Sequence, residues 1–342
     1  MKNSSSMKTC AVIVTYGNRF CFLERVVTAL VDLEINRIVI VDNKSAEESE
    51  RSLYKIENEN RKISIVRLQT NSGSANGYKT GIEEAIKQTD CDFIWLLDDD
   101  NVPRCDALQV LKRLWTTIEY TKKSELMSLV SFREDRPLYL RAVMENNPKI
   151  VLGRKNIYRA FHIADIIRKV IDDLLRKRDN LAPCTAKEYG EIYAAPYGGM
   201  FFNKKLIEAI GYPNEQYYLY VDDHEFSYRI IKNFGKMYLA TESIIEDIDQ
   251  SWHTRTDGFA FSRIAKDDNY VRLYYSVRNR VYFEKTELVD NWVVYSINML
   301  IYSVLVLGVA LARLRFKNIK IYFTAVCHGL SGKMGRNGEY GL

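Results

Sequence analysis

The sequence lacks the patterns that mark a small disulfide-bonded domain or a zinc protein. Its six cysteines contain no CxxC pair: Cys10, Cys21, Cys91, Cys105, Cys184 and Cys327. Zinc sites and disulfide frameworks usually depend on closely spaced cysteines, so we interpret these six residues as reduced cytosolic thiols. No internal repeat or low-complexity tract is apparent. We therefore expect a folded globular chain.

The sequence also has little excess charge and no leader-like start. Its 49 basic and 44 acidic residues give a net charge of +5, which is too small to indicate a nucleic-acid partner. Residues 1–8 are polar and contain no apolar core of signal-peptide length. We therefore expect the chain to begin in the cytosol and to bind no nucleic acid.

The length of 342 residues is large for one compact domain and small for three. We expect a catalytic domain over residues 8–265, with an insertion at 133–190 that is part loop and part helix (160–178). Residues 266–342 are helical, aromatic and then apolar in pattern. We expect them to form a region that associates with a membrane or forms oligomers.

One long uncharged segment, residues 292–312, qualifies by length as a membrane-spanning helix. It nevertheless contains Ser296, Asn298 and Ser303. Four basic residues follow it at once: Arg313, Arg315, Lys317 and Lys320. Because basic flanks stay in the cytoplasm, a single crossing would export either this tail or the catalytic body. We favour a helix that is buried in the protein or lies in the membrane interface.

Apolar strand-like runs alternate with helix-like stretches between residues 10 and 100. The expected strands are 10–16, 37–42, 63–68 and 92–97, and the expected helices are 19–33, 46–60 and 73–88. This alternation predicts a doubly wound, mostly parallel α/β sheet. Ligands of such sheets bind beyond the carboxyl ends of the strands, and all four expected strands carry polar or acidic residues there.

Three adjacent acids, Asp98-Asp99-Asp100, follow the fourth expected strand. Their carboxylates repel one another unless a cation lies among them. Mg²⁺ or Mn²⁺ binds carboxylate oxygen, can bridge to a diphosphate and offsets the charge that builds on a leaving diphosphate. The other interpretation is an acidic surface turn, with Asn101 and Pro103 as turn residues.

The second and third strand ends suggest contacts with a nucleotide. Asp42, followed by Asn43 and Ser45, could accept hydrogen bonds from a base or a ribose. It could equally form an Asx-turn or cap the next helix. The pattern Asn71-x-Gly73-x-Ala75-x-Gly77 opens a helix whose N-terminus would favour phosphate. Its small residues could instead serve tight packing of the helix on the sheet.

A second acidic cluster, Asp222-Asp223-His224-Glu225, precedes a helical pattern. Asp222 and Glu225 have the spacing of a capping box, which leaves Asp223 free in the first turn. Asp223 could act as a general base that deprotonates a sugar hydroxyl. Alternatively, it is an acid that the helix dipole favours at this position.

Two further motifs admit a functional and a structural interpretation. His253, in Ser251-Trp252-His253, could complete a metal sphere or could be a structural histidine. Arg278 and Arg280 lie in an aromatic helical segment. They could contact a diphosphate or an acceptor, or could form a basic side that faces the cytosol or a membrane.

The order of the motifs resembles that of family 2 inverting glycosyltransferases, which have the GT-A fold. The matching motifs are VTYGNR, VDNKS, NSGSANG, WLLDDDN, PYGGMFF, YVDDHEF, SWH and YYSVRNR. They cover about residues 8–285, with a weaker match in the tail at HGLSGKMG. Bacterial polysaccharide rhamnosyltransferases and galactofuranosyltransferases look most similar. The combination is specific for the family and uninformative about the sugar.

The resemblance implies a GT-A catalytic domain with a Rossmann-like nucleotide half and a C-terminal helical extension. Its donor-binding residues would be Thr15, Tyr16, Arg19, Asp42, Asn71, Gly73, Asp99, Tyr197, Gly198 and Gly199. Its metal ligands, for Mn²⁺ or Mg²⁺, would be Asp98, Asp100 and His253. Asp223 matches the catalytic base. Close galactofuranosyltransferases look to carry a tryptophan pair where this chain has Phe201-Phe202, so the sugar and the acceptor stay open.

We therefore expect an enzyme that transfers a sugar, with rhamnose or galactofuranose favoured, from a UDP- or dTDP-linked donor to a hydroxyl of a growing surface polysaccharide. A lipid-linked acceptor would place it at the cytoplasmic face of the inner membrane, where it could also self-associate. A nucleotidyltransferase usually needs a Gly-rich basic loop after the first strand, and VTYGNR offers one Gly and one Arg. A non-catalytic sugar-nucleotide-binding or scaffold subunit is the other alternative.

Overall fold

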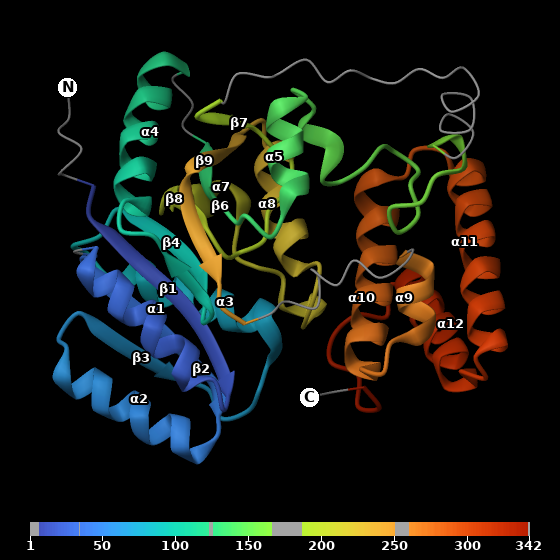
Figure 1. Ribbon diagram of the computed structural model, residues 1–342, viewed down its shortest axis with the longest axis horizontal. Coiled ribbons are helices and arrows are strands. Elements are labelled where there is room, and N and C mark those ends of the chain that lie inside the picture. The colour runs from blue at the N-terminus through green and yellow to red at the C-terminus, as the bar shows by residue number, and fades with distance from the viewer. Residues whose placement is uncertain (1–6, 34, 123–125, 166–186, 250–259, 341–342) are drawn as a thin grey trace. The chain divides into compact units, whose positions relative to one another are not determined.

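The protein is described by a computed structural model that covers residues 7–33, 35–122, 126–165, 187–249 and 260–340. The chain divides into two compact units (Figure 1). The first unit comprises Met1–Val151, Lys187–Tyr218 and Asp222–Arg255. The second comprises Leu152–Ala186, Leu219–Val221 and Thr256–Leu342. The domain limits expected from the sequence, 8–265 and 266–342, stay a prediction.

Four parallel strands form one half of the sheet in the first unit. They are β1 (Thr9–Gly17), β2 (Arg37–Ser45), β3 (Ile63–Arg67) and β4 (Phe93–Asp98), in the order β3-β2-β1-β4. Helices α1 (Phe20–Asp32), α2 (Glu47–Glu59) and α3 (Gly73–Lys87) connect them. The four predicted strands and three predicted helices are thereby confirmed, to within a few residues at their ends.

The other half of the sheet is mixed. Its strands are β5 (Asn101–Pro103), β6 (Met127–Phe132), β7 (Tyr189–Glu191), β8 (Met200–Asn203) and β9 (Lys236–Asp247). Strand β8 lies antiparallel between β4 and β6, and β9 runs parallel to β6. Short strands β5 and β7 pair antiparallel with β9. The pattern of residues 104–132 predicts a helix followed by a strand at 127–132, which β6 confirms, and no single strand was predicted at β8 or at the long β9.

The remaining helices of this unit are α4 (Ala107–Lys122), α5 (Pro137–Met144), α7 (Leu206–Ile210) and α8 (Asp222–Lys232). Two 3-10 turns, η2 (Pro148–Ile150) and η3 (Glu215–Tyr217), accompany them. Helix α5 lies within the expected insertion at 133–190. The helix expected at 160–178 lies mostly outside the described residues.

The sheet is buried on both faces, as the continuous apolar strands predict. Alternate residues of β1 join two different hydrophobic clusters, with Ile13 in one and Val12 in the other. On the second face α3 approaches β1 closely, since a Cβ added at Gly77 would lie 2.7 Å from a methyl carbon of Val14. Gly77 therefore serves helix–sheet packing, which was one of the two interpretations of the Asn71–Gly77 pattern.

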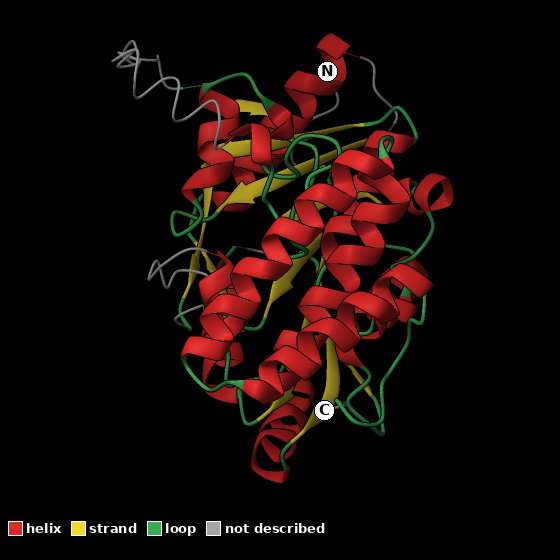
Figure 2. Ribbon diagram, turned by 90° about the vertical axis from the view of Figure 1, so that its right-hand side faces the viewer, coloured by secondary structure: helices red, strands yellow, loops and turns green. Residues whose placement is uncertain are grey.

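The second unit is helical (Figures 1 and 2). It contains α9 (Ala260–Lys266), α10 (Tyr270–Phe283), the π-helical turn η5 (Glu284–Leu288), α11 (Trp292–Ala312) and α12 (Phe316–Ser331). Tyrosines fill its core: the Tyr158 and Tyr322 hydroxyls lie 2.9 Å apart, and Ser303 Oγ lies 2.9 Å from Tyr322. Glu284, fully buried, accepts a hydrogen bond of 2.6 Å from Arg280 Nε.

Helix α11 coincides with the uncharged segment 292–312. Within the described ranges it is the one helix long and apolar enough to cross a membrane, with a mean hydropathy of 2.1. One third of its most apolar window (33%) is buried inside the protein. The remaining positions of this window are partly or fully exposed.

Candidate active site

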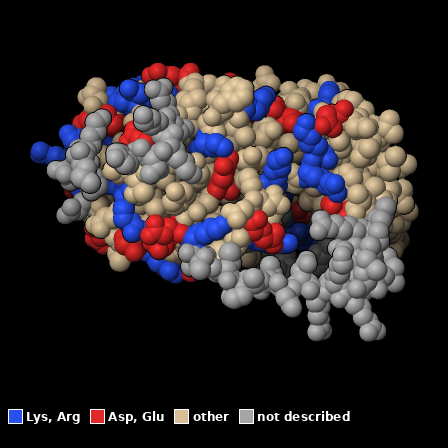
Figure 3. Space-filling view, turned by 90° about the horizontal axis from the view of Figure 1, so that it is seen from above, with Lys and Arg blue, Asp and Glu red and all other residues tan. Residues whose placement is uncertain are grey.

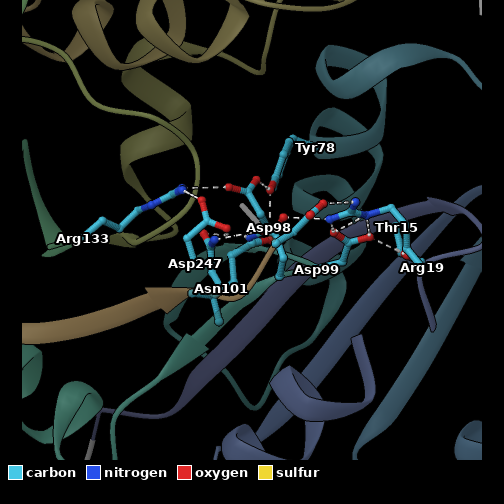
Figure 4. Close-up of polar contacts among 11 residues, drawn as sticks. Thr15, Arg19, Tyr78, Asp98, Asp99, Asn101, Arg133 and Asp247 are labelled. Carbon is cyan, nitrogen blue, oxygen red and sulfur yellow. Dashed lines mark hydrogen bonds and ion pairs between the residues drawn. The ribbon is translucent and has the colours of Figure 1, made fainter. Parts of the chain in front are cut away.

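The carboxyl ends of the parallel strands bring the predicted acidic site together (Figure 4). Asp98 is the last residue of β4 and pairs in register with Val14 of β1, so Thr15 and Asp98 lie at the same edge of the sheet. Asp99 and Asp100 continue past that edge, and Asp42 lies opposite Thr15 in the neighbouring strand. Thr15, Asp42 and Asp98 therefore lie at one edge of the sheet, as predicted, and their roles in ligand binding stay predictions.

Asp99 is the buried member of the acidic run, with 3% of its surface exposed. Thr15 Oγ1 donates to it at 2.8 Å, and Arg19 Nε donates at 2.9 Å. Burial raises the pKa of Asp99, while Arg19 and Thr15 oppose that rise. Both carboxylate oxygens of Asp99 accept hydrogen bonds from Thr15 or Arg19. Asp99 therefore orders the Thr15–Arg19 segment, whether or not it also contacts a nucleotide sugar.

Asp98 and Asp100 are more accessible. Tyr78 Oη donates to Asp98 at 2.6 Å, and the Asp98 side chain is 38% exposed. Arg19 Nη2 and Asn101 Nδ2 donate to Asp100, at 2.7 and 3.0 Å.

The electrostatics of Asp100 indicate excess negative charge. Burial first, and then the charges of Asp98, Asp99 and Asp247, raise the pKa of Asp100 to about 8. The arrangement thus disfavours a full set of ionised carboxylates in the absence of a cation. Negatively charged carboxylate oxygens are the ligands that Mg²⁺ and Mn²⁺ prefer. The residues present therefore fit a hard divalent cation.

The third predicted ligand, His253, lies outside the described residues. Within the described part of the chain, no group of three His, Cys, Asp or Glu side chains is placed to hold a metal ion. Arginines contact the carboxylates instead, Arg19 at Asp100 and Arg133 at Asp98. The ligand set Asp98, Asp100 and His253 therefore stays a prediction.

The sequence reasoning missed four residues of this site. Arg133 is 4% exposed and bridges Asp98, at 3.4 Å, to Asp247. Arg19 Nη1 donates to Asp249 at 2.6 Å, and Tyr78 reaches Asp98 from α3. Arg133 directly follows the predicted strand 127–132. A search for polar residues after this strand, as after the four earlier strands, would have found it. Asp247 ends β9, a strand without a sequence prediction, and Asp249 follows two residues later.

Gly198 packs directly against the acidic site. A Cβ at this position would lie 2.6 Å from Asp98 Oδ2 and would overlap Asn101 Oδ1. Its neighbour Gly199 has a φ of +100°, which favours glycine. The predicted donor-binding residue Gly198 therefore borders the predicted metal ligand Asp98, and Gly199 packs against Ser131 and Ile245.

Gly198→Ala should weaken metal-dependent binding of a nucleotide sugar, because the added methyl must displace the Asp98 carboxylate. Calorimetric titration of the donor in the presence of Mn²⁺ measures the effect. Gly308→Ala is the matched control, since a Cβ at Gly308 meets nothing within 4 Å. Unchanged donor binding by Gly198→Ala would contradict the placement of Asp98 in the site.

The second strand end is organised by internal hydrogen bonds. Asp42, 4% exposed, accepts from the backbone N–H of Ser45 at 2.7 Å, as the Asx-turn interpretation expects. Asn43 accepts from the N–H of Ser72 at 2.8 Å and donates to the carbonyl of Gly73 at 3.0 Å. Asn43 therefore ties the second strand end to the loop after the third. Its role was not predicted.

Some backbone N–H groups at the start of α3 already donate to acceptors within the protein. Asn71 Oδ1 accepts from the N–H of Gly73 at 3.0 Å, and the carbonyl of Tyr218 accepts from the N–H of Ala75 at 3.3 Å. Gly73 has a φ of +80°, and a Cβ there would overlap the Tyr218 carbonyl. These bonds occupy two N–H groups that were expected to favour phosphate. The roles of Asn71 and Gly73 in donor binding stay predictions.

Tyr16 and Tyr197 differ in exposure. The Tyr16 ring is 46% exposed beside the acidic site, 5.5 Å from the Arg19 guanidinium carbon. The Tyr197 ring is 4% exposed and packs 4.2 Å from the ring of Tyr78. Tyr16 is therefore accessible, whereas Tyr197 packs against Tyr78, and the roles of both residues in donor binding stay predictions. Phe201 and Phe202 are fully buried in β8. The difference between this phenylalanine pair and a tryptophan pair is therefore a difference in core packing.

The two acids at the start of α8 have different environments. Asp222 is 2% exposed and accepts from Ser74 Oγ at 2.7 Å, and burial followed by the charge of Asp223 raises its pKa to about 8. Asp223 is partly exposed in the first turn. The predicted capping box is wrong, because Glu225 accepts from Arg229 Nη2 at 2.7 Å and Asp222 turns to Ser74.

The raised pKa of Asp222 makes a prediction about stability. The folded protein holds a proton that the unfolded chain releases near its ordinary pKa of 3.8, so the contribution of Asp222 to stability is lost as the pH rises from about 4 to about 8. The side chain of Asp222→Asn cannot ionise. As the pH rises over this range, the Tm of the metal-free variant should therefore fall less than that of the metal-free wild type. Calorimetric scans at several pH values test this, and parallel curves for the two proteins would contradict it.

Residues 219–221, which precede α8 in the chain, are held inside the second unit. Asn279 Nδ2 donates to the carbonyls of Leu219 and Tyr220, at 2.7 and 2.8 Å. Tyr220 and Val221 both have a φ of 68°, an uncommon conformation that is strained for a β-branched residue. Asn279 thus stabilises a strained segment directly before the acidic pair.

The expectation that Arg278 contacts a diphosphate or faces solvent is not what the structure shows. Arg278 is 1% exposed, and its Nη1 donates to the carbonyl of Gly335 at 2.6 Å. Its guanidinium carbon lies 4.7 Å from the ring centre of Tyr275. Arg280 pairs with Glu284, also within the second unit. Both arginines therefore have structural partners.

Comparison with known proteins agrees with this architecture. Residues 10–176, just under half of the chain, match the family model described as Glycosyl transferase family 2. The crystal structure of GalNAc-T7 with UDP, GalNAc and Mn²⁺ is similar, with 15% sequence identity and a TM-score of 0.51. The match covers 84% of this chain and 52% of that one, so this chain spans about half the length of the GalNAc-T7 structure.

Two crystal structures of S. aureus TarS 1–349 are similar at lower TM-scores. The first has 14% identity and a TM-score of 0.44, and the second, in complex with UDP-GlcNAc, has 13% identity and a TM-score of 0.46. Each match covers 95% of this chain and 92% of the other. No curated protein matches the sequence.

The class of the protein follows from these findings. The sheet order, the acidic strand end and the likeness to GalNAc-T7 confirm the predicted GT-A fold. The family match over residues 10–176 supports the predicted class of enzyme, a glycosyltransferase.

Proposed function

We propose that this chain is an inverting glycosyltransferase that moves a sugar from a nucleoside-diphosphate donor to a hydroxyl of a glycan. The observation that carries the proposal is the acidic edge of the sheet. There Asp98 and Asp100 are surrounded by charged partners, and the pKa of Asp100 is raised to about 8 by burial and like charges. A site with this surplus of negative charge suits a cation and, with it, a diphosphate.

The donor would lie along the carboxyl ends of β1, β2 and β4. Thr15, Tyr16, Arg19 and Asp42 would border the nucleotide, and Asn71 and Gly73 would approach it from the start of α3. We infer a UDP- or dTDP-linked donor, with rhamnose or galactofuranose as the favoured sugar. UDP in the GalNAc-T7 structure supports the nucleotide class, and the motif resemblance supports the sugars.

Asp98, Asp100 and His253 would hold Mn²⁺ or Mg²⁺. When bound, the cation offsets the negative charge that develops on the departing nucleoside diphosphate. The chain's own part is to fix the carboxylates: Tyr78 donates to Asp98, Asn101 donates to Asp100, and Gly198 leaves room beside Asp98. The Mn²⁺ in the GalNAc-T7 structure supports this assignment.

Asp223 is the better candidate for the base of the two acids in α8. Asp222 is buried, and burial with the charge of Asp223 raises its pKa to about 8, so it keeps its proton at neutral pH. Asp223 is partly exposed and can meet an acceptor. In the proposed reaction it takes the proton of the acceptor hydroxyl, whose oxygen attacks the anomeric carbon opposite the leaving diphosphate.

The acceptor we propose is a growing surface polysaccharide, probed most simply as a lipid-linked oligosaccharide. The protein would then act in the cytoplasm, at the inner face of the membrane. The basic residues that follow α11 and the apolar surface of that helix support this location.

The stereochemistry of the product tests the proposal. Donors linked to UDP and to dTDP are incubated with the protein, Mn²⁺ and a soluble oligosaccharide acceptor, and the new linkage is assigned by NMR. We expect one donor to be consumed, with the anomeric configuration inverted. Retention of configuration would contradict the base mechanism. Release of pyrophosphate in a parallel incubation with a nucleoside triphosphate and a sugar 1-phosphate would indicate nucleotidyl transfer instead.

A further inference from the structure

Helix α11 has its apolar residues on the outside. Five of them form one face: Val293, Ile297, Leu300, Val304 and Leu311, which are 45–69% exposed. They are separated by three, four or seven positions, which places them in one row along the helix. We call this row the apolar face.

The buried side of α11 carries polar side chains that form hydrogen bonds inside the second unit. Asn298 Nδ2 donates to the carbonyl of Asn156 at 2.8 Å, and Asn298 Oδ1 accepts from the N–H of Ile163 at 3.0 Å. Ser303 bonds Tyr322, and Tyr295 Oη donates to Glu284 at 3.3 Å. A helix of a water-soluble domain normally shows the reverse distribution. The apolar face therefore suits a surrounding that is itself apolar.

The apolar surface extends past the end of α11. Leu314, in the connection to α12, is 74% exposed, and Phe316 at the start of α12 is 61% exposed. In Figure 3, the end of the view where α11 lies in Figure 1 is predominantly uncharged. Exposed apolar residues that form a contiguous patch mark an interaction site.

The same stretch of sequence contains nearly all the excess positive charge of the protein. Residues 291–338 include no Asp or Glu and six basic residues: Arg313, Arg315, Lys317, Lys320, Lys333 and Arg336. The whole chain has 49 basic and 44 acidic residues, so the remainder has 43 and 44, a net charge of −1. The net positive charge of the chain thus falls in the segment that bears the exposed apolar residues.

We propose that the apolar face is a membrane-docking surface, on which α11 lies in the plane of a bilayer that contains anionic lipids. The apolar side chains enter the boundary between headgroups and acyl chains, and the neighbouring basic residues contact acidic headgroups. The inference goes beyond the proposed reaction, because it concerns binding to a lipid surface with neither donor nor acceptor present.

The contacts of α11 argue against a helix that crosses the bilayer. A crossing would either break the bonds of Asn298, Ser303 and Tyr295 or carry their partners, including buried Glu284, into the hydrocarbon. Unpaired polar groups are costly there. An in-plane helix keeps every one of these bonds.

A second copy of the chain fits the apolar face less well than a bilayer does. In a two-fold dimer the apolar face of one copy would cover that of the other, and the basic residues beyond its end would need acidic residues of the second copy. Among the described residues, Arg315 pairs with Asp268 and Lys320 lies 3.9 Å from Glu339, whereas Arg313 and Lys317 form no ion pair. Anionic headgroups supply the opposite charge.

Flotation of the full chain with vesicles tests the docking surface. We expect binding to vesicles of mixed phosphatidylglycerol and phosphatidylcholine, and about tenfold weaker binding to phosphatidylcholine alone. The triple variant Ile297→Glu, Leu300→Glu, Val304→Glu should lose binding at least tenfold, because three charges would enter the apolar layer. Arg313→Glu with Lys320→Glu should weaken binding to the anionic vesicles only.

The controls separate docking from folding and from catalysis. Phe234, 96% exposed in the first unit, provides a matched apolar-to-acidic change, and Phe234→Glu should bind vesicles like wild type. The triple variant should keep the wild-type Tm and the wild-type turnover of a soluble acceptor. Vesicle binding is measured without nucleotide sugar or acceptor, so a failure of the proposed reaction would leave the flotation result unchanged.

Three outcomes would overturn the docking surface. One is equal vesicle binding by wild type and the triple variant. The second is a wild-type dimer that the triple variant converts to a monomer, which would make the face a self-association surface. The third is a wild-type protein that only detergent, and neither high salt nor alkaline carbonate, releases from the vesicles, which would indicate a spanning helix.

Discussion

Replacing Asp223 by Asn should lower turnover by about 10²–10⁴-fold, the range that a positioned general base contributes. Binding of the nucleotide sugar should be unchanged, because the donor is expected at the ends of β1, β2 and β4 and not at α8. The change preserves the size of the side chain and removes only its ability to accept a proton. Steady-state kinetics with a soluble acceptor, together with calorimetric titration of the donor, measures both quantities.

The neighbouring carboxyl Glu225 provides the control for this prediction. It lies in the same first turn of α8, and its carboxylate is engaged by Arg229 at 2.7 Å. Glu225→Gln should therefore retain turnover close to that of wild type. Wild-type turnover in Asp223→Asn would remove the base from the mechanism, and loss of donor binding in that variant would indicate a structural effect.

Replacing Asp100 by Asn should abolish metal-dependent donor binding without destabilising the metal-free protein. Burial and the charges of Asp98, Asp99 and Asp247 already disfavour ionised Asp100, which is why its pKa is raised to about 8. A neutral amide of the same shape removes this repulsion and can still accept a hydrogen bond from Arg19. We expect the apparent affinity for the donor in Mn²⁺ to fall at least about tenfold, while the Tm in EDTA stays the same or rises.

Asp249 is the matched control for Asp100. It also accepts from Arg19, at 2.6 Å, but its side chain is 42% exposed and outside the predicted ligand set. Asp249→Asn should keep metal-dependent binding of the donor. A lower Tm of Asp100→Asn in EDTA, with donor binding still dependent on metal, would show that Asp100 is a structural residue.

The first half of the fold could be predicted because its signals are local. Each of the strands 10–16, 37–42, 63–68 and 92–97 is a continuous apolar run, and each ends in polar residues. Since parallel strands end at one edge, this pattern alone brought Thr15, Asp42 and Asp98 together. The second half depends on pairings between distant segments, such as β8 between β4 and β6, for which the sequence offers no local signal.

The side-chain partners of the site were harder to predict than its acids. Arg133 and Asp247 reach the site only because β6 and β9 run parallel and end beside it. Asp222 and Glu225 have the spacing of a capping box, but tertiary partners, Ser74 and Arg229, prevail over that local pattern. The segment 292–312 is uncharged throughout in sequence, and only the fold shows that Asn298 and Ser303 lie on the inner side.

Binding of nucleotide sugars with and without metal tests the central claim most directly. Wild-type protein is titrated with UDP- and dTDP-linked sugars by calorimetry, once in Mn²⁺ and once in EDTA, with thermal shift as a second readout. The account predicts that one donor class binds in Mn²⁺ and that EDTA abolishes the binding. Absence of binding by every nucleotide sugar, or equal binding in Mn²⁺ and in EDTA, would contradict it.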